Sequence, residues 1–235
     1  MSKYSLMIFA AGYGKRMKKL TKNKPKSLLT VGGKPLINHA LDIGLDFSPK
    51  NIVVNAHFHH EMLIQHLKKT PIKMSLEYPT ILETGGGLRK ALSILDSNPV
   101  MTLNSDTVWF GPNALSLLAK NWQPKKMDGL LLCTLPNATT GYTCKGDFAT
   151  SKDGKLRRNG DLIYTGAQII KTDLLYDIKK TKFSVNLLWD KIINQKRLYG
   201  IIYPGKWFEV GTPERLSIAN NFLNQQDNLK IINGF

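Results

Sequence analysis

The sequence contains only two cysteines, Cys133 and Cys144, and no Cys-x-x-Cys pair. This scarcity excludes a disulfide framework and a structural zinc cluster, and it is typical of reduced thiols in the cytoplasm, where we expect the protein to be. No apolar run approaches the roughly 20 residues of a membrane helix, and the run from Leu6 to Ala11 is also too short for a signal peptide. We therefore expect no membrane partner.

Acidic residues are also scarce, since 17 Asp and Glu stand against 33 Lys and Arg, for a net charge of +16. No acid precedes Asp42, whereas residues 1–41 contain nine Lys and Arg. Such a charge favours a polyanionic partner, whether nucleic acid, a membrane surface or phosphorylated metabolites. Tyr13 is the only aromatic residue between positions 13 and 34, so a stacking surface for nucleic acid is not favoured and we expect no nucleic-acid partner.

Short apolar runs alternate with helical patterns along the chain, which predicts an α/β fold with a doubly wound, mostly parallel, Rossmann-like sheet. We expect strands near 4–11, 51–55, 73–77, 100–103, 130–132, 198–203 and 208–210, and helices near 35–47, 61–67, 87–95, 113–121, 185–194 and from 213. Turn signals at Lys145-Gly146-Asp147 and Lys152-Asp153-Gly154 predict a small antiparallel hairpin region. The sequence contains no linker, so we expect a single domain over 1–235, and no feature specifies an oligomeric state.

The run Ala10-Ala11-Gly12-Tyr13-Gly14-Lys15-Arg16-Met17 directly follows the first predicted strand. Ligands of open α/β sheets bind beyond the carboxyl ends of strands, and glycines let backbone amides approach phosphate oxygens, so this loop is predicted to bind phosphate. It matches neither a Rossmann fingerprint nor a Walker A loop, and a tight turn is the alternative. Arg16 offers a planar fork and Lys26 a compact charge for a triphosphate.

Asp106 follows the apolar strand near 100–103 and is expected at the same sheet edge. Mg²⁺ prefers hard oxygen ligands and is usually held by one or two carboxylates together with substrate phosphates, which makes Asp106 the leading metal ligand. A cap for the next segment is the alternative interpretation of this aspartate.

Several motifs, in this order, carry a resemblance to a known family. They are Ala-Ala-Gly-x-Gly-x-Arg-Met, Pro25-Lys26-Ser27-Leu28-Leu29, Gly33-Lys34-Pro35-Leu36-Ile37, Leu82-Glu83-Thr84-Gly85-Gly86-Gly87, Asn104-Ser105-Asp106 and Trp207-Phe208-Glu209-Val210-Gly211-Thr212. Together they resemble the sugar-1-phosphate nucleotidyltransferases over nearly the whole chain. The Leu82–Gly87 run and the compact length look most like the uridylyltransferases that act on N-acetylmuramate 1-phosphate in peptidoglycan recycling.

The resemblance implies an Mg²⁺-dependent transfer from UTP to a sugar 1-phosphate, with residues 1–125 mainly binding the nucleotide and 126–235 mainly the sugar phosphate. The implied catalytic residues are Arg16, Lys26 and Asp106. The implied nucleotide-binding residues are Ala10, Ala11, Gly12, Gly14, Arg16, Lys26, Glu83, Thr84, Gly85 and Asn104. The implied sugar-phosphate-binding residues are Asp147, Thr165, Gly166 and Asn186. The implied metal ligands are Asp106 and Glu209.

Glu209 departs from the family pattern, in which an aspartate is the second metal ligand, and its extra methylene moves the carboxylate outward. A partly buried carboxylate paired with a lysine is the alternative role. A mannose- or heptose-1-phosphate guanylyltransferase, or a phosphocholine cytidylyltransferase, is the alternative activity. A nucleotide- or nucleic-acid-binding protein without catalysis is the alternative class, but the joint presence of Arg16, Lys26 and Asp106 argues against it.

Overall fold

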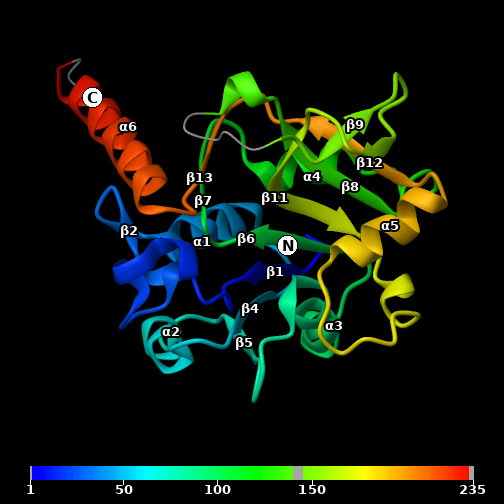
Figure 1. Cartoon of the computed structure of the whole chain (residues 1–235), viewed down its shortest axis with the longest axis horizontal. Helices are drawn as coiled ribbons and strands as arrows, with labels where there is room; N and C mark the ends of the chain where they lie inside the picture. The colour runs from blue at the N-terminus through cyan, green and yellow to red at the C-terminus, as the bar shows by residue number, and fades with distance from the viewer. Residues whose placement is uncertain (1, 140–144, 233–235) are drawn as a thin grey trace.

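The computed structural model describes residues 2–139 and 145–232, with side chains to residue 225. At its centre is a seven-stranded sheet in the order β12-β8-β11-β6-β1-β4-β5 (Figure 1). Its strands are β1 (Leu6–Phe9), β4 (Ile52–Ala56), β5 (Lys73–Leu76), β6 (Val100–Asn104), β8 (Gly129–Thr134), β11 (Ile163–Ile170) and β12 (Leu198–Ile202). Both halves of the chain therefore contribute to one sheet.

The sheet is mostly parallel, as predicted. β1 pairs in parallel with β4 and β6, β4 with β5, and β12 with β8. The exception is β11, which lies between β6 and β8 and runs antiparallel to both. Since most strands point the same way, their carboxyl ends meet at one edge of the sheet, where ligands of such folds bind.

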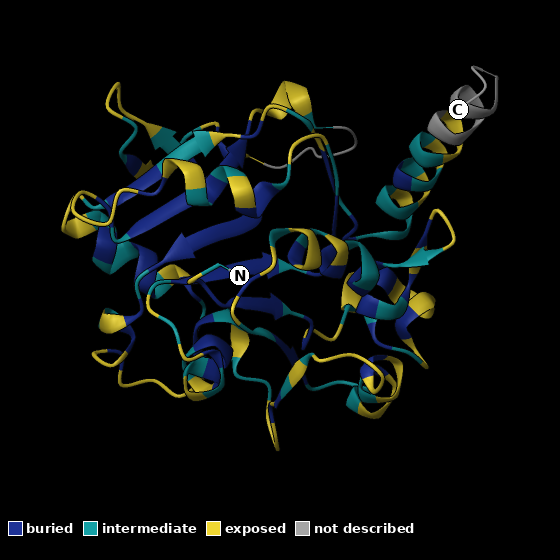
Figure 2. Ribbon diagram, turned by 180° about the vertical axis from the view of Figure 1, so that it is seen from behind, coloured by how far each residue is buried: buried dark blue, intermediate teal, exposed yellow. Residues whose placement is uncertain are grey.

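Helices cover both faces of the sheet, which confirms the doubly wound α/β architecture. They are α1 (Leu36–Phe47), α2 (His60–Leu67), α3 (Glu83–Leu95), α4 (Ala114–Asn121) and α5 (Asn186–Asn194). The C-terminal helix α6 (Pro213–Ile232) does not cover the sheet, and its Ala219 packs in a separate apolar cluster with Met17 and Val31. Residues of α1, α2 and α4 share one core with alternate strand residues such as Leu6 and Ile8, whereas α3 and α5 share the other with Met7. Figure 2 shows the central strands buried between these layers. In the described ranges, no helix has the length and apolar character to cross a bilayer.

Short antiparallel pairs accompany the main sheet. The predicted turn at 152–154 joins β9 (Phe148–Thr150) to β10 (Leu156–Arg158), where Gly154 takes a φ of 85°. Near the N-terminus β2 (Thr30–Val31) pairs with β3 (Lys34–Pro35). The sequence did not predict β7 (Thr107–Phe110), which pairs with β13 (Lys206–Glu209) so that Thr107 faces Glu209. This pair brings Glu209 next to the turn that carries Asp106.

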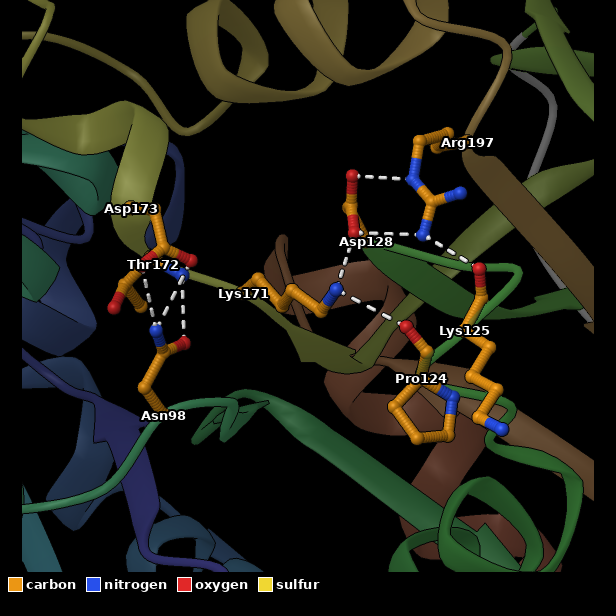
Figure 3. A network of polar contacts seen from close by, with 8 residues as sticks. All are labelled: Asn98, Pro124, Lys125, Asp128, Lys171, Thr172, Asp173 and Arg197. Carbon is orange, nitrogen blue, oxygen red and sulfur yellow. Dashed lines mark hydrogen bonds and ion pairs between the residues drawn. The ribbon is translucent and has the colours of Figure 1, made fainter.

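A polar network holds β8, β11 and β12 together at the end of the sheet where β8 and β12 begin, opposite their carboxyl ends (Figure 3). Asp128, before β8, accepts hydrogen bonds from Lys171 Nζ at 2.7 Å and from Arg197 Nε at 2.6 Å. Burial alone would raise the pKa of Asp128, but these hydrogen bonds and charges outweigh it and lower the pKa. The network is structural and lies away from the strand ends that carry the predicted site.

Of the two cysteines, Cys133 is a free thiol buried within β8, and burial raises its pKa, which keeps it protonated. Cys144 lies outside the described residues.

Candidate active site

Three neighbouring cavities open at the carboxyl edge of the sheet. The first is lined by residues from the ends of β1, β4, β5 and β6, from the 3-10 turn at Lys26–Leu28 and from around the start of α3. They are Phe9, Ala10, Ala11, Gly12, Lys26, Ser27, Asn55, Glu77, Ile81, Glu83, Thr84, Asn104, Ser105 and Asp106. It therefore unites most of the predicted nucleotide-binding residues. Polar side chains at strand ends and backbone amides of the loop after β1 supply its hydrogen-bonding groups.

The second cavity lies beside the first and is basic. Its lining residues are Gly12, Tyr13, Gly14, Lys15, Arg16, Lys26, Asp106 and Gly211. Gly14 takes a φ of 63°, and a Cβ there would stand 2.9 Å from the Cβ of Lys26. A side chain at position 14 would thus be strained and would crowd Lys26, so glycine is what lets the loop fold against it. The cavity has the positive charge and the accessible backbone of a phosphate site.

Lys26 and Asp106 meet where the first and second cavities join. The Lys26 Nζ lies 2.6 Å from Asp106 Oδ2, and the two side chains are 13% and 26% exposed. Lys26 comes from a short 3-10 turn at Lys26–Leu28, and Asp106 from the turn between β6 and β7. The chain therefore brings together a cation and an anion that lie 80 residues apart in the sequence.

The Glu209 carboxylate is held by two arginines. Its Oε1 accepts a hydrogen bond from Arg16 Nη2 at 3.0 Å, and its Oε2 accepts one from Arg215 Nη1 on α6. Its side chain is 13% exposed, and it folds over Gly211, where a Cβ would stand 2.1 Å from Oε1. The group as a whole carries one net positive charge next to the second cavity.

The predicted metal ligands fit a divalent cation unequally. Asp106 presents a partly exposed carboxylate to two cavities and is suited to Mg²⁺. Both oxygens of Glu209 are already engaged by guanidinium groups, which would repel a dication, so this carboxylate does not fit a metal as it is arranged here. No group of three or more His, Cys, Asp or Glu residues in the described ranges is placed to hold a metal ion. The role of Glu209 as a ligand stays a prediction.

The third cavity shares Phe9, Thr84 and Asn104 with the first and continues toward the second half of the chain. Its other lining residues are Asp147, Tyr164, Gln168, Ser184, Val185, Asn186 and Trp189. Burial raises the pKa of Asp147, partly offset by a hydrogen bond from Tyr164 N and by the charge of Arg158. Carboxylate and amide groups beside an aromatic wall are suited to a hydroxyl-rich ligand. Two predicted sugar-phosphate residues, Asp147 and Asn186, thus lie together here.

The structure does not bring Thr165 into this cavity. Its side chain is fully buried, and its hydroxyl donates a hydrogen bond to the carbonyl of Leu132 at 2.6 Å. Alternation along β11 turns Thr165 to the face opposite Tyr164. Gly166 interrupts the pairing of β11 with β8, takes a φ of 91°, and leaves room for the side chain of Asn104, which a Cβ would approach to 2.9 Å. Gly166 therefore does not line a cavity itself but makes room for Asn104, which lines the first and third cavities.

The glycine run after Thr84 also differs from the prediction. α3 begins at Glu83, four residues before the expected start at Gly87, so the glycines form its first turns. The amide of Gly85 donates to the carbonyl of Phe183 at 2.9 Å, and a Cβ on Gly85 would stand 2.5 Å from the Phe183 ring. Gly85 is thus a packing residue and is not among those that line the first cavity.

Sequence reasoning missed two buried polar residues of the first cavity, Asn55 and Glu77. Each stands at the carboxyl end of a strand that was correctly predicted, on the β4–β5 side of β1 in the sheet. A polar residue at that end of a buried parallel strand is the signal that would have found both. Arg215, in the first turn of α6, carried no comparable signal.

Comparisons with known proteins find similar sequences over most of the chain. The model of the MobA-like NTP transferase domain family matches residues 6–139. The chain is 34% identical over 222 residues to the N-acetylmuramate alpha-1-phosphate uridylyltransferase of Caulobacter vibrioides, covering 88% of this chain and 92% of that protein. It is 27% identical to the mannose-1-phosphate guanyltransferase of Kluyveromyces lactis, covering 97% of this chain and 68% of that protein.

Solved structures share the fold. HddC from Yersinia pseudotuberculosis, determined in complex with GMP-PN, superposes with a TM-score of 0.74 at 18% identity, covering 93% of this chain and 98% of that chain. At this identity the likeness establishes the architecture alone.

Proposed function

The chain belongs to the sugar-1-phosphate nucleotidyltransferases built on the MobA-like NTP transferase domain, and from this premise we propose that its substrates are UTP and N-acetylmuramate 1-phosphate. Such an enzyme transfers a nucleotidyl group to a sugar 1-phosphate and releases pyrophosphate. The observation that carries the choice of substrates is the similarity to the uridylyltransferase, which is higher than to the guanyltransferase and spans both chains almost completely.

The proposed reaction is an in-line displacement without a covalent enzyme intermediate. An oxygen of the sugar 1-phosphate attacks the α-phosphorus of UTP, and the bond from that phosphorus to the bridging oxygen of the β-phosphate breaks as pyrophosphate leaves. In this arrangement the first cavity takes the nucleobase, the second the β- and γ-phosphates, and the third the sugar. Catalysis then consists of positioning and of charge stabilisation.

The residues at the junction of the cavities have separate roles in this proposal. Lys26 neutralises the α-phosphate and the incoming phosphate, which would otherwise repel each other. The glycine loop and Arg16 bind the β- and γ-phosphates. Asp106 would hold Mg²⁺ together with the substrate phosphates, and the bound ion would neutralise their oxygens. Asp147 and Asn186 bind sugar hydroxyls.

A panel of substrates tests the proposal. Pyrophosphate release is measured with UTP, CTP, GTP and ATP, each combined with N-acetylmuramate, N-acetylglucosamine, mannose and glucose 1-phosphates. We expect UTP to exceed CTP and GTP in kcat/KM by about tenfold or more, because a purine overfills a uracil pocket and cytosine reverses the hydrogen-bond pattern. Preference for GTP and mannose 1-phosphate would favour the guanylyltransferase instead. Binding of a nucleotide without release from any pair would favour the non-catalytic protein.

The arginine contacts of Glu209 give a prediction about its role. Glu209→Gln keeps the shape but places an amide nitrogen against one guanidinium, so Arg16 or Arg215 loses its acceptor. We expect the KM for the nucleotide to rise about five- to tenfold through a loosened Arg16, and the Mg²⁺ concentration for half-maximal rate to stay within about twofold. Titrations of rate against nucleotide and against Mg²⁺ measure both.

The control for this variant is Glu214→Gln, which removes an exposed carboxylate from the first turn of the same α6 helix. It should leave the KM for the nucleotide unchanged. A several-fold higher Mg²⁺ requirement for Glu209→Gln alone would instead make Glu209 a metal ligand, as the family resemblance predicts.

A further inference from the structure

Glu77 is a buried carboxylate to which the proposed reaction assigns no role. It directly follows β5, its side chain faces the first cavity, and the residue is only 2% exposed. Burial of a carboxylate is costly unless its oxygens are hydrogen-bonded. Here Oε1 accepts from Asn55 Nδ2 and Oε2 from the backbone amide of Leu82, each at 2.6 Å. The carboxylate therefore links the end of β4 to the segment that leads into α3.

The contact with Glu77 also fixes the direction of the Asn55 amide. A carboxylate only accepts hydrogen bonds, so Asn55 must turn its NH₂ group toward Glu77 and its oxygen away. That oxygen accepts a hydrogen bond from the backbone amide of Ala10 at 2.7 Å. A continuous chain of hydrogen bonds thus runs from Leu82 through Glu77 and Asn55 to Ala10. Ala10 at one end lines the first cavity, and Leu82 at the other end lies between Ile81 and Glu83, which line its opposite wall.

We propose that Glu77 and Asn55 form a positioning relay that holds the two walls of the nucleobase cavity at a fixed separation and so sets the affinity for the nucleoside triphosphate. The inference rests on the proposed function, in which the first cavity takes the nucleobase. Both side chains are already engaged by protein partners, so the relay acts through the backbone around Ala10 and Leu82. Preorganised walls lower the entropic cost of binding.

Two further contacts of Glu77 tighten this arrangement. A Cβ on Gly87 would stand 2.4 Å from Glu77 Oε1, so only glycine in α3 lets the helix pack over the carboxylate. The backbone carbonyl of Glu77 accepts from His57 Nδ1 at 2.7 Å, and His57 Nε2 lies 3.0 Å from the hydroxyl of Tyr13 in the glycine loop. Because β1, β4 and β5 are neighbours in the sheet (Figure 1), these contacts tie together the loops at three adjacent strand ends.

An exchange of the two side chains tests the relay. In Glu77→Gln, the new NH₂ group faces either Asn55 Nδ2 or the Leu82 amide, which places two donors against each other. In Asn55→Asp, two carboxylates face each other. The double variant, Asn55→Asp with Glu77→Gln, restores every hydrogen bond, but the bond between the two side chains now runs from residue 77 as donor to residue 55 as acceptor. The introduced carboxylate accepts from the Ala10 amide and from the NH₂ of the introduced carboxamide, whose oxygen accepts from the Leu82 amide.

We expect each single variant to raise the Kd for UTP, measured by calorimetry without the sugar phosphate, by about tenfold or more, and the double variant to return within about threefold of the wild type. The KM for the sugar 1-phosphate and kcat at saturating UTP should change by less than about threefold, because the relay does not touch the reacting phosphates. Glu61→Gln, the same change at an exposed carboxylate of α2, is the control and should leave the Kd unchanged.

The outcomes separate the relay from a purely structural role and from the proposed function. Unchanged Kd values in folded single variants, even with lower thermal stability, would overturn the relay, as would a double variant no better than the weaker single one. If the singles do not fold, hydrogen exchange of the wild type decides: slow exchange of the Ala10 and Leu82 amides, slowed further by UTP, supports the relay, and fast exchange of either overturns it. A wild type that binds none of the four nucleotides contradicts the proposed function, while amide protection without nucleotide still tests the hydrogen-bond chain.

Discussion

Lys26→Ala is expected to lower turnover by about 100- to 10,000-fold. The Lys26 ammonium contacts Asp106 at the junction of the first and second cavities, which is where the two phosphates approach each other in the proposed reaction. Its removal leaves their repulsion uncompensated in the transition state, so kcat should fall more than the KM values rise. Steady-state pyrophosphate release at saturating UTP and sugar 1-phosphate measures the effect.

The matched control for this prediction is Lys22→Ala, which removes an exposed lysine from the same basic segment and should keep turnover within about twofold. Lys26→Ala itself should change the free energy of unfolding by no more than about 1–3 kcal/mol, since a partly buried ion pair is lost. Wild-type-like turnover in Lys26→Ala would remove Lys26 from the reaction.

The main elements of the fold follow from local patterns in the sequence. Apolar residues at helical spacing predicted α1 within one residue of its observed start, and Leu36, Ile37 and Leu41 of this helix are buried. β1, β4, β5 and β6 were also placed correctly, because buried parallel strands are short, apolar and bounded by turn residues. Local patterns of this kind depend only on which face of an element is covered.

The pairing of the strands could not be predicted from local patterns in the sequence. β11 was not among the expected strands, and nothing in its sequence indicates that it runs antiparallel between β6 and β8. β7 has only four residues and was missed, although its pairing with β13 places Glu209 beside Asp106. Such pairings depend on contacts between residues far apart in the chain, which a local pattern does not encode.

The candidate site shows the same division. Ala10–Gly14, Lys26 and Asp106 were predicted from local features, because the loop offers backbone amides and Lys26 a positive charge for phosphate, while Asp106 offers a carboxylate for Mg²⁺. The structure places them around the first and second cavities. The glycines after Thr84 were assigned to the ligand, but Gly85 makes room for Phe183, a residue almost 100 positions away. A glycine in a sequence indicates that another group packs closely against the backbone there, but it does not indicate whether that group is a ligand or a side chain of the protein. For the same reason, the sequence could not show that arginines occupy both oxygens of Glu209.

Asp106→Asn is expected to lower turnover by about 100-fold or more, because the variant keeps the shape of the side chain but removes the charge that would hold Mg²⁺. Calorimetry gives a readout that does not depend on turnover. Without Mg²⁺, the variant should bind UTP as tightly as the wild type or more tightly, since a negative charge beside the triphosphate is gone. With Mg²⁺, the wild type should gain affinity and the variant should gain less. An equal gain in both proteins would show that Asp106 does not hold the metal.

Because Asp106 contacts Lys26, a double variant that combines Asp106→Asn with Lys26→Ala tests whether the two residues act together. Their side-chain atoms lie 2.6 Å apart, so each residue also fixes the position of the other. If they act as a unit on the same phosphates, Lys26→Ala in the Asp106→Asn background should cost much less than Lys26→Ala alone, because a catalytic unit that is already broken loses little more. Independent roles predict that the two losses in turnover multiply. The kcat values of the wild type, both single variants and the double variant decide between these outcomes, and differential scanning fluorimetry confirms that all four proteins are folded.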